Sequence, residues 1–332
     1  MRSEYIFASM ALLPLLIGCR DTITDPPPAS PPEEIEVGIA PTAIAAVAGK
    51  IAVGEVAFDF GGLTFGPGVV RWIDPSTGAV LGATEVGTNP QVVIAAGAAR
   101  DRLVAVCTGD YGAIGGELDL LDPDAMAIER TIPLDGQPSA ACAGPGDLVY
   151  LGSYGDGGVA VVDPIAGQII RDWDPGAGYE AAAVAARGEN LFAVDFDSDL
   201  LIHLDSDGVV LDAIAVGDGP IDLVADPRDP DRVYVLHSLE ETLGVVSLGG
   251  RSFSRFSEPI GRAPNDVQWH DGALWIVASL SNEIQSLDPA GGELLLARHV
   301  GVNRNPMQLA FAGGWVFVTN LLSNTVSVLS AG

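Results

Sequence analysis

Short apolar runs separated by polar turns make up most of the chain from residue 41 onward. In residues 264–304, four such runs follow one another, at 267–269, 274–279, 283–287 and 294–300. The residues between them are mainly Asp, Gly, Ser, Asn and Pro, which favour tight turns. Runs of this length bounded by turn residues are typical of β-strands. The pattern therefore predicts a unit of four antiparallel strands.

The same unit recurs along the chain. Each copy opens with a proline or a substitute for it, and the seven openings are Pro41, Pro90, Pro138, Tyr179, Pro220, Pro264 and Pro306. These openings are 49, 48, 41, 41, 44 and 42 residues apart. A period of about 40–50 residues that contains only strands and turns indicates a blade of a β-propeller. We therefore predict an all-β fold, a seven-bladed β-propeller of four-stranded antiparallel blades, over residues 34–332.

The two ends of the repeat region complement each other. The seventh unit ends after its third strand, at residues 325–330, whereas an additional strand at 34–39 precedes the first unit. Pairing of this N-terminal strand with the last blade would supply the fourth strand and remove open strand edges. We expect the N-terminal strand to close the ring in this way.

The last blade carries FVTN at 317–320, followed by SNTVSVL at 323–329. It resembles the YVTN family of seven-bladed propellers, which occurs in bacterial and archaeal surface and secreted proteins. The length of the repeat resembles that family over residues 41–332, but the amino acids themselves match closely only in the last blade. The single Trp-Asp dipeptide, at 173–174, does not repeat, and this disfavours the cytoplasmic WD40 class.

The first 33 residues have the pattern of a targeting segment. Arg2 precedes an apolar run at 5–18, shorter than the about 20 residues that span a bilayer, so residues 1–18 are predicted to be a signal peptide. The run ends in LIGC, which resembles a bacterial lipobox and implies cleavage before Cys19 and lipidation of Cys19. Residues 19–33 contain five prolines and are predicted to be an extended tether. The alternative is an ordinary secretory signal with an incidental cysteine.

These segments predict a lipid-anchored protein of the bacterial cell envelope, periplasmic or at the cell surface. The net charge is −28, from 44 acidic and 16 basic residues. Such a surface repels phosphate backbones, so we expect no nucleic-acid partner, and we expect membrane contact through the lipid anchor only. The charge either favours cationic partners and divalent metal ions or serves solubility alone. Cys107 and Cys142 fall in neighbouring blades, where they would form a disulfide or remain two buried thiols.

Acidic side chains are predicted to converge at the mouth of the channel. The loops before each first strand and after each second strand share one face of a propeller, here called the top face. Glu180, Asp222 and Asp266 come from successive blades at this face and would suit Ca²⁺, a hard ion that binds oxygen. The alternative is a polar rim with water and no ion.

An enzymatic function is the alternative to a binding function. Streptogramin lyases and lactonase-type propellers resemble this fold, and the resemblance implies a channel-centred, metal-dependent lyase or lactonase-type hydrolase. His237, with Glu180 or Asp222, would then be the acid/base pair, because imidazole exchanges protons near neutral pH. A solvated or hydrogen-bonded His237 without catalytic function is the competing interpretation.

Two insertions lengthen the early units, at 54–68 and 108–117. Both follow a second strand, so both are predicted to lie on the top face of neighbouring blades. Their aromatic side chains would either form a cluster there or cover the edge of their own blade. Departures from a regular scaffold commonly carry function, so we expect a binding scaffold for a protein, peptide or glycan of the cell envelope, or a structural subunit of an envelope complex. The predicted ligand-binding residues are Phe58, Phe60, Phe65, Tyr111, Arg262, Arg304 and Asn320.

Overall fold

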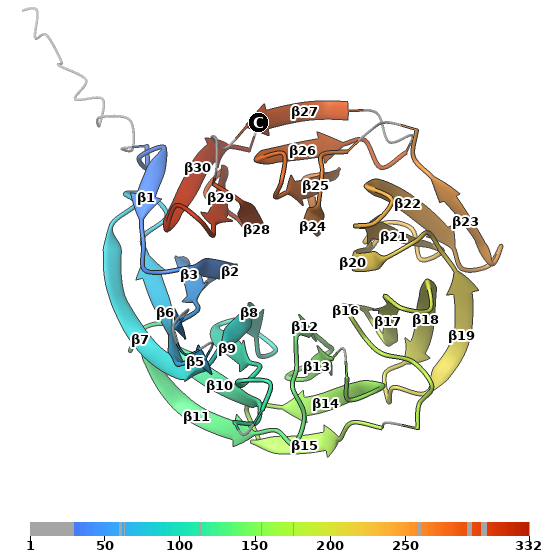
Figure 1. Ribbon diagram of the computed structural model, residues 1–332, viewed down its shortest axis with the longest axis horizontal. Coiled ribbons are helices and arrows are strands. Elements are labelled where there is room, and N and C mark those ends of the chain that lie inside the picture. Colours follow the sequence, from blue (N-terminus) through green and yellow to red (C-terminus); the bar gives the residue numbers. More distant parts are fainter. Residues whose placement is uncertain are drawn as a thin grey trace, which may run out of the picture.

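The computed structural model describes residues 30–59, 62, 64–112, 114–153, 155–174, 176–257, 260–290, 294–299 and 304–331. Seven four-stranded antiparallel sheets stand around a central channel, which confirms the predicted seven-bladed β-propeller (Figure 1). Within the described residues, no helix is long and apolar enough to cross a membrane.

The strands follow chain order from the channel to the rim in the first six blades. Blade 1 contains β2 (Pro41–Val47), β3 (Lys50–Glu55), β6 (Pro67–Ile73) and β7 (Val80–Thr88). Blade 2 contains β8 (Pro90–Ala96), β9 (Arg102–Cys107), β10 (Glu117–Asp122) and β11 (Ala127–Pro133). Blade 3 contains β12 (Ala140–Ala143), β13 (Val149–Gly152), β14 (Val159–Asp163) and β15 (Gln168–Arg171). Blade 4 contains β16 (Ala183–Arg187), β17 (Asn190–Asp195), β18 (Leu200–Asp205) and β19 (Val210–Ala215).

The remaining blades repeat this plan, and the last one also takes in the first strand of the chain. Blade 5 contains β20 (Pro220–Ala225), β21 (Arg232–His237), β22 (Thr242–Ser247) and β23 (Ser252–Arg255). Blade 6 contains β24 (Pro264–His270), β25 (Ala273–Ala278), β26 (Glu283–Leu287) and β27 (Leu294–His299). Blade 7 contains β28 (Pro306–Ala312), β29 (Trp315–Asn320), β30 (Thr325–Ser330) and β1 (Glu34–Glu36). A short hairpin of β4 (Phe58–Asp59) and β5 (Thr64–Phe65) stands apart from these sheets.

Prolines mark the start of the innermost strand in five blades: Pro41, Pro90, Pro220, Pro264 and Pro306. Each pairs with the last residue of the second strand, and a shift in register follows it. Proline has no N–H to donate, so the first position of a strand beside a bulge is where a sheet tolerates it best. This pairing also brings the loops before first strands and after second strands to the same face, the top face.

The turns between third and fourth strands lie on the opposite face, which we call the bottom face. In blade 1 this turn is Asp74-Pro75-Ser76, and Asp74 Oδ1 accepts a hydrogen bond from the Ser76 N–H at 2.8 Å. Proline fixes φ at the second turn position, and aspartate satisfies the backbone two residues later. This explains why Asp-Pro recurs at the period of the blade.

The hydrophobic core consists of layers between neighbouring blades. Trp72 of blade 1 is fully buried in one such layer with Leu103 and Cys107 of blade 2, and its Nε1 donates to Thr84 Oγ1 at 3.0 Å. The second strand of each blade packs on both sides and is almost entirely buried, as in β9, whereas the outer strand β11 is mostly exposed. A strand that is covered on both faces therefore has a continuous run of apolar residues in the sequence.

The N-terminal strand closes the ring, as predicted. β1 pairs antiparallel with β30, with Glu34 opposite Ser327. Ile35 is buried with Phe317 of blade 7, and Glu34 forms an ion pair with Arg304. The strand ends at Glu36 and not at residue 39, because the chain then turns toward blade 1, where the Gly38 N–H donates to Glu55 Oε1 at 2.7 Å.

The chain joins the ring from the bottom face. β1 runs toward the top face, since its last residue, Glu36, pairs with Thr325 at the start of β30. Residues 30–33 therefore lie on the bottom side, and Pro32 packs over Gly78 in the bottom turn of blade 1. The β4–β5 hairpin projects from the top face, so the two features leave the ring on opposite sides.

Candidate functional site

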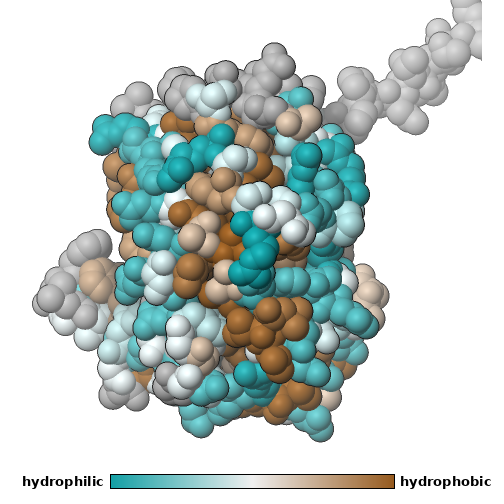
Figure 2. Space-filling model, turned by 90° about the vertical axis from the view of Figure 1, so that its right-hand side faces the viewer, coloured by the Kyte–Doolittle hydropathy of each residue, from teal (hydrophilic) through white to brown (hydrophobic). Residues whose placement is uncertain are grey.

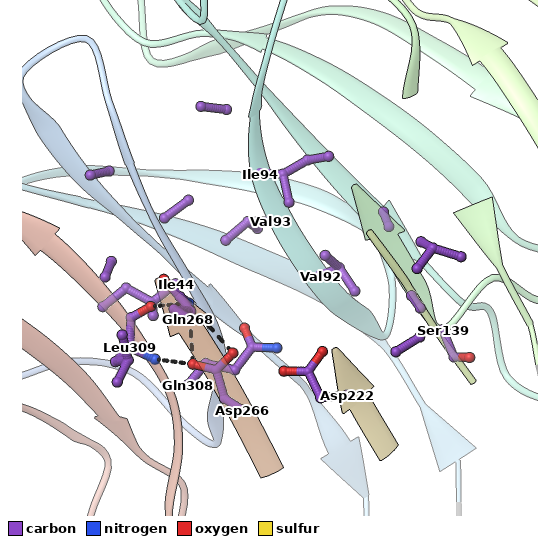
Figure 3. A pocket seen from close by; sticks show the side chains of 18 of the residues that line it. Ile44, Val92, Val93, Ile94, Ser139, Asp222, Asp266, Gln268, Gln308 and Leu309 are labelled. Carbon is purple, nitrogen blue, oxygen red and sulfur yellow. Dashed lines mark hydrogen bonds between the residues drawn. The ribbon is translucent and has the colours of Figure 1, made fainter. Parts of the chain in front are cut away.

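The channel holds a cavity of about 460 Å³ whose wall differs between the two halves of the ring. Figure 3 shows Asp222, Asp266, Gln268 and Gln308 on one side, whereas Val92, Val93 and Ile94 lie on the other. The carboxylates and amides all come from the innermost strands of blades 5 to 7. Blades 1 to 4 contribute aliphatic side chains and Ser139.

The two channel aspartates join neighbouring blades. Asp222 Oδ2 accepts the Val267 N–H of blade 6 at 2.7 Å, and Asp266 Oδ2 accepts the Leu309 N–H of blade 7 at 3.0 Å. Gln268 Nε2 donates to Asp266 Oδ2 at 3.1 Å and to the Leu309 carbonyl at 2.7 Å. These side chains therefore satisfy backbone groups of the next blade that are expensive to leave unpaired.

Burial makes both channel aspartates weaker acids than usual. Loss of water raises the pKa of Asp266 to about 7, against the hydrogen bonds from Leu309 and Gln268 that favour its charged form. The pKa of Asp222 is also well above its usual value, first because of burial and then because of the negative charge of Asp266. A carboxyl group with the pKa of Asp266 exchanges protons near neutral pH. Both carboxylates, however, already accept a backbone N–H of the next blade.

Glu180 does not join the two aspartates. It lies in a separate hollow of about 300 Å³ that is also lined by Tyr179, Asp195 and Asp197. Burial, followed by the charges of Asp197 and Asp195, raises the pKa of Glu180. Among the residues that the structure describes, no group of three or more His, Cys, Asp or Glu side chains is placed to hold a metal ion. The predicted Ca²⁺ trio of Glu180, Asp222 and Asp266 is therefore not assembled here.

His237 lies outside the channel wall. Its side chain is fully buried, its Nε2 accepts the Gly217 N–H at 3.0 Å, and its ring meets that of Phe253 edge-on with 5.2 Å between centroids. Burial lowers its pKa. The neutral imidazole of His237 thus holds the loop before β20 by accepting a backbone hydrogen bond. The structure does not bring His237 into the cavity that Asp222 lines.

Two of the three predicted polar ligand-binding residues are engaged in blade 7. Arg304 binds Glu34 and donates to Thr325 Oγ1 at 3.2 Å, so it fastens the closing strand. Asn320 is fully buried and donates from Nδ2 to Thr325 Oγ1 and Ser327 Oγ, at 3.2 and 2.9 Å. Arg262 alone is exposed, with its Nε 3.7 Å from Glu241 Oε1.

The two insertions bring their aromatic rings together on the top face. Phe58 and Phe65 pair across the β4–β5 hairpin with 4.8 Å between ring centroids, and Phe65 meets Tyr111 edge-on at 5.8 Å. Asp110 Oδ1 holds the second loop by accepting the N–H groups of Gly112 and Ile114, at 2.9 and 2.8 Å. Tyr111 is 56% exposed.

Phe60, the fourth predicted member, lies outside the described residues, as does Cys19. The clustering of Phe58, Phe65 and Tyr111 is thus a feature of the structure, and their part in binding stays a prediction. Cys107 and Cys142 are two separate free thiols. Burial raises the pKa of both, that of Cys142 to about 12, so neither is a ready nucleophile.

Three exposed leucines on the top face were not predicted from the sequence. Leu239, Leu280 and Leu322 occupy the turns that follow the second strands of blades 5, 6 and 7, and they are 61%, 59% and 67% exposed. The side wall in Figure 2 also mixes apolar and polar side chains, so exposure alone is no signal. What distinguishes these leucines is that leucine recurs at the same position of three blades, the second residue after the second strand. Blade 4 has Asp197 at that position.

The ring, its channel and its closing strand define a seven-bladed β-propeller. Known structures with the same fold include hydrazine synthase from Kuenenia stuttgartiensis, with a TM-score of 0.71 at 15% identity, covering 89% of this chain and 97% of that chain. Virginiamycin B lyase from Staphylococcus aureus has a TM-score of 0.71 at 12% identity, covering 90% of this chain and 98% of that chain. The Cps50 (Swd1) propeller domain from Myceliophthora thermophila has a TM-score of 0.70 at 13% identity, covering 89% of this chain and 98% of that chain.

Likeness at these identities shows the fold alone, because one fold serves many unrelated functions. No family model matches the chain. No curated protein sequence matches it either.

Proposed function

We propose that the protein is a binding scaffold of the bacterial cell envelope that engages a protein, peptide or glycan through its top face. The observation that carries this proposal is the aromatic cluster of Phe58, Phe65 and Tyr111. Two insertions on neighbouring blades, each a departure from the regular unit, meet there ring to ring. Aromatic side chains on loops held by a rigid scaffold are common anchors of interfaces.

We also propose that lipidated Cys19 and the tether at 19–33 hold the ring at a membrane, on the periplasmic side or at the cell surface. The FVTN sequence of the last blade supports a relation to the YVTN-type propellers of such locations. Residues 30–33 reach the ring from the bottom face. An anchored ring would thus direct its top face away from the lipid.

Partner capture tests the scaffold proposal. Every strand of the ring lies within residues 34–330, so a chain of residues 30–332 carries the complete fold for solution work. The double variant Phe65→Ser/Tyr111→Ser should capture partner from envelope extracts about tenfold less than wild type, because it removes the ring contacts. The matched control is Ile170→Ser on the outer wall, which is as exposed as Tyr111, at 56%. Equal capture by wild type and the double variant, with unchanged melting temperatures, would overturn the proposal.

Membrane fractionation tests the anchor separately. Full-length Cys19→Ser should leave the membrane fraction, because the only predicted attachment is the lipid on that residue. A variant that stays with the membrane to the same extent as wild type contradicts lipidation at Cys19.

A further inference from the structure

The leucines on the top face share one backbone geometry. Each lies two residues before a residue with positive φ, at Glu241 (52°) for Leu239 and at Asn282 (53°) for Leu280. The same relation links Leu322 to a residue with φ of 58°. Equal turns on successive blades project these side chains in equivalent directions. They form a row, which we call the leucine arc.

The turn itself does not require leucine. In blade 4 the corresponding position is Asp197, and it also stands two residues before a positive φ, at Asp199 (55°). The fold therefore accepts a charged side chain at this position, which is the usual content of an exposed turn. Leaving three leucines exposed on one face gives up the favourable burial of their side chains, unless another molecule covers them.

The spacing of the arc fits a helix laid across the blades. Packed sheets stand about 10 Å apart, so the arc spans roughly 20 Å from blade 5 to blade 7. Side chains seven residues apart on an α-helix lie about 10.5 Å apart along its axis. An amphipathic helix can thus present one apolar side chain to each leucine in turn.

The charges beside the arc favour a basic partner. Arg255 pairs with Glu240, with 2.6 Å between Nε and Oε2, and Arg262 lies near Glu241. By contrast, Asp197 and Asp218 are exposed and have no ion-pair partner in the part of the chain that the structure describes. Asp218 directly precedes Gly219, over which Leu239 packs. The protein as a whole carries a net charge of −28.

We propose that the leucine arc, with Asp197 and Asp218 at its end, docks a cationic amphipathic helix of a partner protein. This inference rests on the proposed scaffold function, since it names the partner chemistry of the same face. Apolar side chains of the helix cover Leu239, Leu280 and Leu322. Its lysines or arginines meet the free carboxylates.

A synthetic peptide tests the docking directly. The probe is a helical Leu/Lys peptide of about 18 residues, titrated by fluorescence anisotropy against residues 30–332. The triple variant Leu239→Ser/Leu280→Ser/Leu322→Ser should bind at least about tenfold more weakly, the equivalent of about 1.4 kcal/mol. The matched control replaces three aliphatic side chains of the outer wall, in the variant Leu81→Ser/Ile170→Ser/Leu211→Ser. It should bind the peptide as wild type does.

Charge is tested with the same peptide. Asp197→Asn/Asp218→Asn should weaken binding about threefold at low salt and reduce its salt dependence, because screening acts on exposed charges. A peptide with Glu in place of Lys should bind at least about tenfold more weakly than the Leu/Lys peptide. Equal binding of the two peptides, or no binding of the Leu/Lys peptide, overturns the proposal.

Two further outcomes separate this inference from the scaffold proposal. If the outer-wall control loses as much peptide affinity as the arc variant, the arc is not the site. If the arc variant captures the envelope partner normally while Phe65→Ser/Tyr111→Ser does not, the arc inference fails and the scaffold proposal stands. Melting curves of all variants should lie close to wild type, because the replaced side chains are exposed or, at Phe65, only partly buried.

Discussion

The two halves of the ring are held together around the channel by different interactions. In blade 2 the second residue after the opening proline is Val92, which packs on its apolar neighbours. In blades 5 and 6 the same position is Asp222 and Asp266, which bond to backbone N–H groups of the next blade. The repeat therefore determines the backbone of a blade and leaves open how each blade is joined to its neighbour. At this position apolar packing joins the blades in one half, whereas directional hydrogen bonds join them in the other.

The two halves meet where β1 closes blade 7, and removing that strand should have the largest effect. Deletion of residues 30–37 exposes the edge of β30 and removes Ile35, whose burial contributes about 1.5–3 kcal/mol. It also removes the ion pair of Glu34 with Arg304. We expect the melting temperature to fall by several degrees, as measured by circular dichroism. A deletion of residues 30–32 alone, which removes the contact of Pro32 with Gly78 but keeps β1, should have a smaller effect. An unchanged melting temperature in the longer deletion would show that closure does not stabilise the ring.

Removing a carboxylate from the polar half should have the next largest effect. Asp266→Ala leaves the Leu309 N–H without its partner and removes one of the two acceptors of Gln268 Nε2, and unfolding in urea should show a loss of about 1–3 kcal/mol. Gln308→Ala changes the corresponding position in blade 7, where the side chain forms no hydrogen bond with the described residues, and should cost about 0.5 kcal/mol or less. Equal losses in both variants would show that Asp266 acts only by filling space.

The stability of the polar half should also depend on pH. Because the pKa of Asp266 is raised in the folded protein, the folded state binds more protons than the unfolded state between about pH 4 and pH 7. The contribution of Asp266 to stability is therefore fully present below about pH 4 and is lost as pH rises to about 7. In Asp266→Asn, the decline in stability between these values should be smaller by about 3 kcal/mol. Parallel curves for wild type and variant would contradict this assignment.

The top face should show almost no effect on stability. Tyr111→Ser removes a side chain that is 56% exposed, so the free energy of unfolding should stay within about 0.5 kcal/mol of wild type. Urea titration checks this. A larger loss would mean that the aromatic cluster stabilises the blade edge and that its exposure is incidental.

The sequence pattern was sufficient for the fold because each blade repeats the same turn chemistry and the same buried second strand. It was also sufficient for the closing strand and for the two insertions, which interrupt a regular period. Glu180 was misplaced because Tyr179 does not mark the start of a strand as Pro220 does. β16 begins only at Ala183, so Glu180 stays in the preceding loop, whereas Asp222 lies inside its strand.

The remaining errors concern side-chain direction and pattern. His237 is the last residue of its strand, and the period of the repeat does not say whether such a residue faces the channel or the adjoining loop. Leu239, Leu280 and Leu322 were missed because a single apolar residue in one turn does not stand out beside the apolar runs that flank it. Only comparison of one position across blades, with Asp197 as the exception, distinguishes them.

The pairing of β1 with β30 also sets a timetable for biosynthesis. The hydrogen bond from the Ala40 N–H to Asn324 Oδ1 joins groups 284 residues apart. At a translation rate of about 5–20 residues per second, the earliest strand waits roughly 15–60 s for its partner. Blades 1 to 6 have all their strands before then, but the circle stays open at one seam until the final strand is made. During that interval the unpaired edges at the seam are exposed to other chains, and synthesis of β30 removes that hazard.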